Sequence, residues 1–212
     1  MEIKFNYGKS YVPFNLGKLQ NVSVISGQDI NPLTDLSEEV SAKLQNPIGK
    51  QGLAKEIKKK NAKNILIVIN DVTRPTPYEH ILPPILKELD KADIPKEKIK
   101  FIIATGIHRQ MTPYEIRAVV GDEVIDTYEV INHNCNNEDS LIYMGTLKFG
   151  TEFYINRLCI DSDFVITTGV IVPHYFAGYS GGRKSIMPGI AGRKTITHNH
   201  SLMKHKKATT CN

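Results

Sequence analysis

The sequence lacks long apolar runs and a cysteine framework. No apolar stretch approaches the roughly 18 residues that a membrane-spanning helix needs. The first residues, MEIKFNYGKS, contain no apolar block of the kind that a signal peptide carries. The three cysteines stand far apart and no CxxC occurs, which argues against both a disulfide framework and a thiolate zinc site. We therefore expect a soluble, cytoplasmic protein with no membrane partner.

The net charge of +5 is also poorly distributed for binding nucleic acid. Three of the surplus charges are lysines of the last nine residues, 204–212 (KHKKATTCN), which contain no acidic side chain. A second lysine-rich stretch, KEIKKKNAK at 55–63, is typical of the solvated end of an amphipathic helix with Leu53 and Ile57 facing inward. No recognition motif accompanies either stretch, so we expect no nucleic-acid partner.

The pattern that is present predicts an α/β fold. The first thirty residues alternate apolar and polar side chains, which predicts a small antiparallel β layer. Helices are expected at Leu33–Leu44, 50–60, 78–91 and Pro113–Val120, and strands at 64–70, 98–104, 128–132, 141–144 and 163–168. Runs such as NILIVIN and KIKFIIA are continuously apolar, as in strands buried on both faces. Their alternation with helices predicts a doubly wound, mostly parallel sheet.

Three of these buried strands run directly into unusual polar loops. NILIVIN leads to DVTRPTP, KIKFIIA leads to TGIHR, and DFVITTG leads to VIVPH. Ligands of open parallel sheets bind in the crevice outside the carboxyl ends of the strands. We therefore expect four side chains to converge on one site: Asp71, Arg74, His108 and His174.

Each of these four residues also has a purely structural interpretation. Asp71 would cap the following helix, and Arg74 would be a surface charge beside two prolines. His108, after a Thr-Gly turn, and His174, after a proline, would each be satisfied by structural hydrogen bonds. The prolines equally suit a guanidinium held in place for bidentate recognition of a carboxylate or phosphate. The convergence of four such residues at one sheet edge favours a site.

The segment 170–192, VIVPHYFAGYSGGRKSIMPGIAG, is too rich in glycine and proline for a helix or a strand. Its GYSGGRKS portion approaches the phosphate loop GxxxxGK[ST], but Arg183 stands where the second glycine is required, which argues against an ATPase or GTPase. Consecutive glycines beside Arg183 and Lys184 still suit one phosphate or another anion. Downstream, His198 and His200 form an HxH pair, either a surface pair or a source of metal ligands.

Four motifs in this order, DVTRPTP, ATGIHRQMT, PHYFAGYSGGRKSIMPGIAG and NHSLM, together resemble the N-terminal domain of the nickel-pincer lactate racemase family. The segment NPIGKQGL at 46–53 is similar to that family as well, and the resemblance extends from Leu33 to Met203. It implies a cofactor-binding and catalytic domain over 1–203, followed by a basic tail at 204–212. Members of this family run to roughly twice this length and carry a further C-terminal domain. The chain is therefore expected to lack that domain.

The resemblance implies a covalently bound cofactor, the nickel-pincer nucleotide (pyridinium-3,5-bisthiocarboxylate mononucleotide nickel). The lysine of the GGRK motif, here Lys184, would hold it, and the histidine of NHSLM, here His200, would be the nickel ligand with His198 as a bystander. The remaining cofactor-contacting residues would be Asp71, Val72, Thr73, Arg74 and Pro188.

The implied reaction is racemisation or epimerisation of a 2-hydroxy acid, with lactate the first candidate, by reversible hydride transfer between substrate and cofactor. His108 and His174 would be the acid-base pair, because each enantiomer needs its own base and an unperturbed pKa of about 6.5 suits both directions. Arg74 would hold the substrate carboxylate or stabilise the oxyanion. Cofactor-biosynthesis proteins would be partners. Two other classes stay open: a non-catalytic half-length domain that binds a nucleotide or phosphate, and a histidine-ligated metal hydrolase.

Overall fold

The computed structural model describes residues 2–17, 21–23, 25, 27–28 and 30–208. The chain divides into two compact units, the first up to residue 34 and the second from residue 35 onward. Within the described residues, no helix combines the length and the apolar character that a membrane crossing requires.

The first unit contains an antiparallel hairpin of β1 (Glu2–Tyr7) and β2 (Ser10–Asn15), which confirms the expected N-terminal β layer. Cross-strand pairs such as Phe5–Val12 share one apolar face. The alternation was expected to continue as a strand through NVSVISG at 21–27. Residues 21–23, 25 and 27 belong to no strand, and residues 24 and 26 lie outside the described residues.

The second unit is built on a four-stranded parallel sheet, which confirms the α/β class. The sheet strands are β3 (Ile65–Asn70), β4 (Ile99–Ala104), β5 (Glu129–Asn132) and β8 (Phe164–Thr167). The strand order is β5-β4-β3-β8, so the chain moves from β3 outward to β5 and then returns to the other side of β3. The strand order therefore reverses between β3 and β8, the place where open α/β sheets bind ligands.

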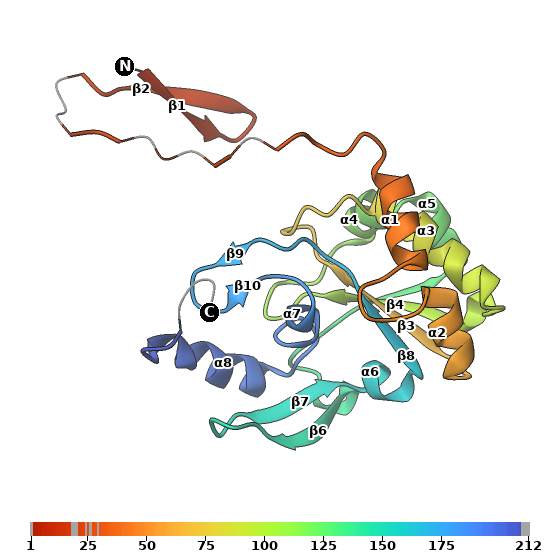
Figure 1. Ribbon diagram of the computed structural model, residues 1–212. Coiled ribbons are helices and arrows are strands. Elements are labelled where there is room, and N and C mark those ends of the chain that lie inside the picture. The colour runs from red at the N-terminus through yellow and green to blue at the C-terminus, as the bar shows by residue number, and fades with distance from the viewer. Residues whose placement is uncertain (1, 18–20, 24, 26, 29, 209–212) are drawn as a thin grey trace. The chain divides into compact units, whose positions relative to one another are not determined.

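The parallel sheet lies between two layers (Figure 1), and alternate residues of its strands belong to two different core clusters. Ile65 and Ile67 of β3 face the helices of one layer, while Leu66 and Val68 face the other. The helices of the first layer are α1 (Leu36–Gln45), α2 (Leu53–Lys59), α3 (Tyr78–Lys91), α4 (Pro113–Val120) and α5 (Asp122–Thr127). The second layer contains β6 (Leu141–Thr146), β7 (Glu152–Asn156), α6 (Arg157–Asp161), α7 (Arg183–Ile186) and α8 (Arg193–Ser201).

Helix and strand boundaries follow local signals in the sequence. Asp35 caps α1 by accepting from the Glu38 backbone N–H at 2.9 Å, so the helix begins three residues later than Leu33. Thr112 and Glu115 form a reciprocal capping box that starts α4. Single turns of 3-10 helix lie at Lys96–Lys98, Glu138–Ser140 and Leu202–Lys204.

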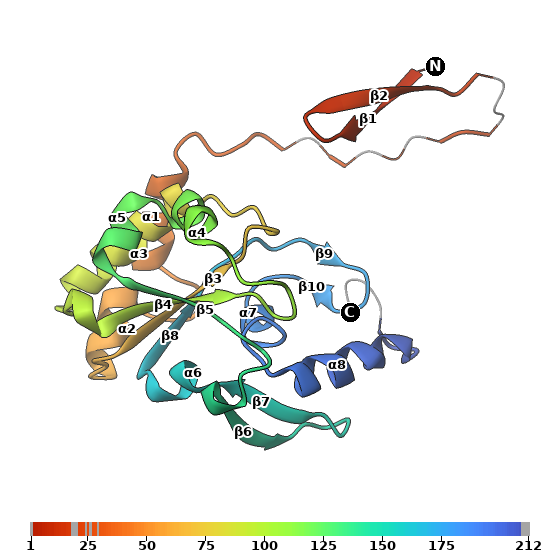
Figure 2. The same ribbon diagram turned by 180° about the vertical axis from the view of Figure 1, so that it is seen from behind.

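Two expectations need correction. The strand expected at 141–144 is present as β6, but it pairs antiparallel with β7 in a separate two-stranded sheet, beside α8 in both views (Figure 1, Figure 2). The glycine-rich segment 170–192 is not wholly irregular: it contains β9 (Pro173–His174), β10 (Gly178–Tyr179) and the single turn of α7. These elements are two to four residues long, short enough to fit between the glycines.

Gly189 allows the α7 turn to approach the end of β4. A Cβ placed there would lie 2.2 Å from the Ser185 carbonyl oxygen and 2.8 Å from the Ala104 Cβ. The backbone of Gly189 also accepts a hydrogen bond from the Gly106 N–H at 2.9 Å, which fixes the loop after β4 against the loop after α7. Only glycine fits this contact without moving the backbone.

We expect Gly189→Ala to lower the free energy of unfolding by about 1–3 kcal/mol, because the added methyl group overlaps backbone atoms that cannot move independently. Urea unfolding followed by circular dichroism measures this loss. Gly27→Ala is the matched control, since a Cβ at Gly27 would meet nothing within 4 Å. Equal stability of the two variants would show that the close contact is not needed.

His133 directly follows β5 and is buried, and both of its ring nitrogens form hydrogen bonds. Nε2 lies 2.9 Å from the Ala191 carbonyl oxygen and so donates to it, while Nδ1 lies 3.1 Å from the Asn156 side-chain amide and accepts. The ring is therefore neutral. Burial lowers the pKa of His133, and the carbonyl of Ala191 opposes this only in part.

The free energy of unfolding should fall as the pH drops below about 6.5, because the unfolded chain then binds a proton that folded His133 rejects. Full stability is present above the unfolded pKa and is lost on the acid side. Urea midpoints between about pH 5 and pH 7 measure the slope. In His133→Asn the slope should be smaller than in the wild type, and an unchanged slope would contradict the assignment.

Candidate functional site

Asp71 follows β3 directly and folds back into its own turn. The side chain is only 4% exposed, and its Oδ1 accepts hydrogen bonds from the Thr73 backbone N–H at 2.9 Å and the Thr73 hydroxyl at 2.6 Å. The Arg74 backbone N–H donates to the Asp71 carbonyl oxygen at 3.0 Å and closes the turn. Helix α3 begins at Tyr78, and its N-cap residue is Pro77 with no side-chain cap, so the interpretation of Asp71 as its cap is wrong.

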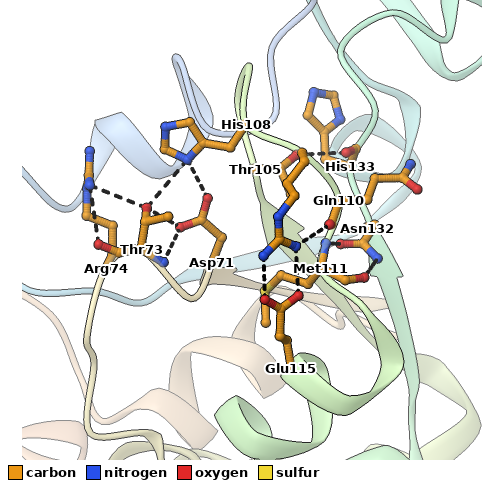
Figure 3. A network of polar contacts seen from close by, with 11 residues as sticks. Asp71, Thr73, Arg74, Thr105, His108, Gln110, Met111, Glu115, Asn132 and His133 are labelled. Atoms are coloured by element: carbon orange, nitrogen blue, oxygen red, sulfur yellow. Dashed lines mark hydrogen bonds and ion pairs between the residues drawn. The ribbon is translucent and has the colours of Figure 1, made fainter.

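Asp71 also fixes the ring of His108 from the neighbouring loop, as Figure 3 shows. Its Oδ2 lies 2.6 Å from His108 Nδ1, and the Thr73 hydroxyl lies 3.5 Å from the same nitrogen. Because a carboxylate only accepts, Nδ1 carries the proton and Nε2 of the neutral ring is left with its lone pair. The ring is 43% exposed, so Nε2 can meet a ligand. This is the arrangement of a base oriented by a buried carboxylate.

Cationic side chains gather beside this pair. The pKa of Lys184 is lowered, first by burial and then by the nearby guanidinium groups of Arg74 and Arg183. Among the described residues, neither Lys184 nor Arg74 forms an ion pair with a carboxylate. Arg183 donates to the Ala177 carbonyl oxygen at 3.1 Å, which holds it at the glycine loop. Uncompensated charge of this kind fits an anionic ligand.

Two further imidazoles, those of His174 and His200, contact the ring of Phe176. The ring centroids of His174 and Phe176 are 4.7 Å apart, and those of Phe176 and His200 are 5.9 Å apart, both in edge-to-face contact. Burial, followed by the charge of Lys184, lowers the pKa of both histidines. The Nδ1 atom of His174 is buried without a hydrogen-bond partner among the described residues, which is unusual unless a ligand supplies one. Both rings are therefore available in the neutral form.

The loops after β3, β4 and β8 and the segment α7–α8 enclose a single cavity of about 500 Å³. The expected convergence of the sequence-predicted residues is therefore observed for most of them. Those that line the cavity are Asp71, Arg74, His108, His174, Lys184, Pro188 and His200. An adjoining and mostly apolar cavity of about 580 Å³ shares three of these residues, Lys184, Pro188 and His200.

Three other residues from the sequence analysis lie outside this lining. Val72 is 43% exposed, and Thr73 acts through its hydrogen bonds to Asp71. His198 and His200 lie on α8, where i and i+2 side chains point apart; His198 bonds instead to the Thr151 hydroxyl at 2.7 Å. The interpretation of HxH as two ligands on one side is therefore excluded.

Thr105 and Ser185 also line the cavity, although no role at a site was expected for either from the sequence. The Thr105 hydroxyl donates to the His133 carbonyl oxygen at 2.7 Å, and the Ser185 hydroxyl donates to the Thr168 carbonyl oxygen at 3.3 Å. Ser185 stands in the Ser/Thr position of the phosphate-loop pattern, and that was the one available signal for it.

Comparison with known proteins gives a consistent family. Residues 7–211 match the family described as lactate racemase N-terminal domain. The lactate racemase of Thermoanaerobacterium thermosaccharolyticum is 37% identical over 200 residues, covering 93% of this chain and 46% of that protein. The lactate racemase of Lactiplantibacillus plantarum is 38% identical over 177 residues, covering 82% of this chain and 41% of that protein.

Solved structures agree with the sequence relatives. The lactate racemase apoprotein from Thermoanaerobacterium thermosaccharolyticum has a TM-score of 0.84 at 34% identity, covering 100% of this chain and 49% of that one. A Thermotoga maritima protein has a TM-score of 0.64 at 25% identity, covering 84% of this chain and 43% of that one. The chain thus spans about half the length of the curated relatives that it matches.

We expect Asp71→Asn to change the tautomer of His108, because an amide can donate to Nδ1 where the carboxylate can only accept. Nitrogen-15 NMR of the imidazoles at neutral pH should show protonated Nδ1 in the wild type and a mixture in the variant. Asp126→Asn, which alters a carboxylate paired with Arg117 elsewhere, should leave the His108 signals unchanged. If Asp71→Asn also leaves them unchanged, Asp71 does not orient the ring.

Proposed function

Because the chain belongs to the lactate racemase N-terminal domain family, we propose that it forms the cofactor-binding and catalytic half of a 2-hydroxy-acid racemase or epimerase. The observation that carries the proposal is the meeting of an oriented base, a second neutral imidazole and unpaired cations in one cavity. Lactate is the first candidate substrate, by analogy with the relatives. The chain spans about half the length of these relatives. In this proposal, residues of the other half would also contribute to substrate binding and turnover.

The side chains of the cavity fit a nucleotide that brings its own metal ligands. Among the described residues, no group of three or more His, Cys, Asp or Glu side chains could hold a metal ion. A metal here would therefore depend on donor atoms of the bound molecule, with the neutral ring of His200 as the side-chain ligand. Arg183, which lines the adjoining cavity, suits its phosphate, and the lowered pKa of Lys184 leaves more of the amine unprotonated, as covalent attachment requires.

The nickel-pincer nucleotide, when bound, supplies the hydride acceptor that protein side chains lack. The chain's own residues move the proton. Nε2 of His108 would take the hydroxyl proton of one enantiomer, and His174 would take that of the other. Asp71 would stabilise the protonated form of His108 through the Nδ1 contact, as the carboxylate does in catalytic triads.

Arg74 would bind the substrate carboxylate. Its guanidinium contacts the Thr73 carbonyl and hydroxyl oxygens at 3.4 Å and is held at the cavity. Within the part of the chain that the structure describes, it has no carboxylate partner. A planar guanidinium can donate two parallel hydrogen bonds to a carboxylate, which restricts the orientation of the bound acid. In the same proposal, Thr73 and Pro188 contact the cofactor, Val72 lies in its binding loop, and cofactor-biosynthesis proteins act on the chain in the cytoplasm.

Two alternative functions would use the cavity in different ways. A non-catalytic domain that binds a nucleotide or phosphate would use the same cations without proton transfer. A histidine-ligated metal hydrolase is disfavoured, because the described residues offer no cluster of ligands and would leave the amine of Lys184 without a role. Both remain outcomes of the following experiment.

Protein produced in cells that synthesise the cofactor should carry a covalent adduct on Lys184 and one equivalent of nickel. Intact mass, peptide mapping and metal analysis measure both. Lys184→Arg keeps the positive charge but should carry no adduct, because a guanidinium is not an effective nucleophile here. Unmodified protein containing zinc would favour the hydrolase, and an unmodified, metal-free protein would favour the binding domain.

With the adduct in place, His108→Ala and His174→Ala should each lower the rate of lactate racemisation by about 10²–10⁴-fold while retaining the adduct. The exchange of D- and L-lactate is followed with enantiomer-specific dehydrogenases. His198→Ala is the control and should keep the wild-type rate, because His198 bonds to Thr151 outside the cavity. Wild-type turnover in either of the first two variants would contradict the two-base assignment.

A further inference from the structure

The hydrogen-bond ladder between β3 and β8 is interrupted where the strand order reverses. The two strands pair in register up to Val68 and Thr167, and the Thr168 N–H still donates to the Val68 carbonyl oxygen at 3.0 Å. In a regular parallel pair the next bond would join the Asn70 N–H to the Thr168 carbonyl oxygen. On its other side β3 continues to pair with β4 as far as Asn70 and Ala104, so only the β8 side opens.

Two hydroxyl groups replace this missing bond. The Asn70 N–H donates to the hydroxyl oxygen of Tyr78 at 2.5 Å, and the Thr168 carbonyl oxygen accepts from the Ser185 hydroxyl at 3.3 Å. The Thr168 hydroxyl lies 3.1 Å from the Tyr78 hydroxyl and 2.8 Å from the Val68 carbonyl oxygen, so it joins the two strands both directly and through the tyrosine. The backbone groups are thus satisfied while the strands separate.

Tyr78 is placed to fix both sides of this opening. It stands at the first residue of α3 and is 1% exposed, so its ring cannot shift independently of the core. One of its partners, Asn70, directly precedes Asp71, and the other, Thr168, begins the segment that leads to His174. Ser185, bonded to the Thr168 carbonyl, is the neighbour of Lys184.

We propose that Tyr78 is a positioning residue for the reaction: its hydroxyl sets the distance between the β3 loop and the β8 segment across the cavity. The effect of Tyr78 on catalysis rests on the proposed function. Its effect on the distance between the β3 loop and the β8 segment does not. Asp71 already ties the β3 loop to His108. Together with the direct bonds from Thr168 to the Val68 carbonyl oxygen, the Tyr78 hydroxyl relates this pair to His174 and, through Ser185, to Lys184. Tyr78 itself touches no reacting atom.

The test is Tyr78→Phe, which keeps the buried ring and removes only the hydroxyl. Amide hydrogen exchange of the unloaded protein should rise in the segments 70–76, 168–174 and 183–186 and stay unchanged in β4. Tyr128→Phe is the matched control, because Tyr128 packs on Phe101 of β4, with ring centroids 5.5 Å apart, in the same helix-side core as Tyr78 but without lining the cavity. A rise in exchange spread evenly over the whole sheet would indicate general destabilisation and would overturn the proposal, as would no rise at all.

A second pair of variants tests the same contact from the Thr168 side, in case Tyr78→Phe folds poorly. Thr168→Val removes the hydroxyl that contacts Tyr78 and should reproduce the local rise in exchange, whereas Thr168→Ser keeps the hydroxyl and should rescue it. Equal behaviour of the Val and Ser variants would contradict a positioning role for the hydroxyl contact.

In cofactor-loaded protein, Tyr78→Phe should lower kcat on the order of a hundredfold with little change in KM, because the binding groups remain and only their separation is lost. An unchanged kcat would overturn the catalytic part of the proposal. If the wild type shows no racemisation, the proposed function fails, while the exchange measurements still decide whether Tyr78 fixes the two segments.

Discussion

The structure depends on the parallel pairing of one fully buried strand with neighbours on both sides. β3 is continuously apolar because both of its faces are covered, and its two edges are occupied by β4 and β8. Once these three strands run in the same direction, the segments that follow them must emerge at one edge. The chemistry of the cavity is therefore a consequence of strand direction more than of any single loop.

Within that edge, polar contacts decide which groups remain reactive. The carboxylate of Asp71 is fully used by Thr73 and His108, and the ring nitrogens of His133 are used inside the fold. In contrast, among the described residues, His174 has a buried nitrogen without a hydrogen-bond partner, and Lys184 has no carboxylate partner. The protein thus satisfies its structural polar groups and leaves a small set free, the usual physical signature of a binding site.

Much of this arrangement could be predicted from the sequence, and the reasons are local. Continuous β-branched runs predict buried strands, and strand direction then places Asp71, Arg74, His108 and His174 together. The pairing of β6 with β7 was missed because no strand was expected at Glu152–Asn156, so β6 had no neighbouring strand with which a hairpin could be predicted. The proposed role of Tyr78 could not be predicted either, because a tyrosine at the start of a helix gives no sign of what its hydroxyl contacts. That hydroxyl bonds to Asn70, eight residues away, and to Thr168, ninety residues away. The resemblance of four ordered motifs identified the family, which strand patterns alone could not do.

The composition of the cavity lining has an electrostatic consequence. Among the described residues, Asp71 is the only acidic side chain in the lining, against Arg74 and Lys184, so we expect the mouth of the cavity to keep a positive potential. Such a field attracts small organic acids from solution and raises their local concentration before any specific contact forms. Mobile ions screen it over about 8 Å at physiological ionic strength, a distance comparable to the depth of a small-molecule cleft. Capture of an acid by this protein would therefore depend on the salt content of its surroundings, independently of the chemistry that follows.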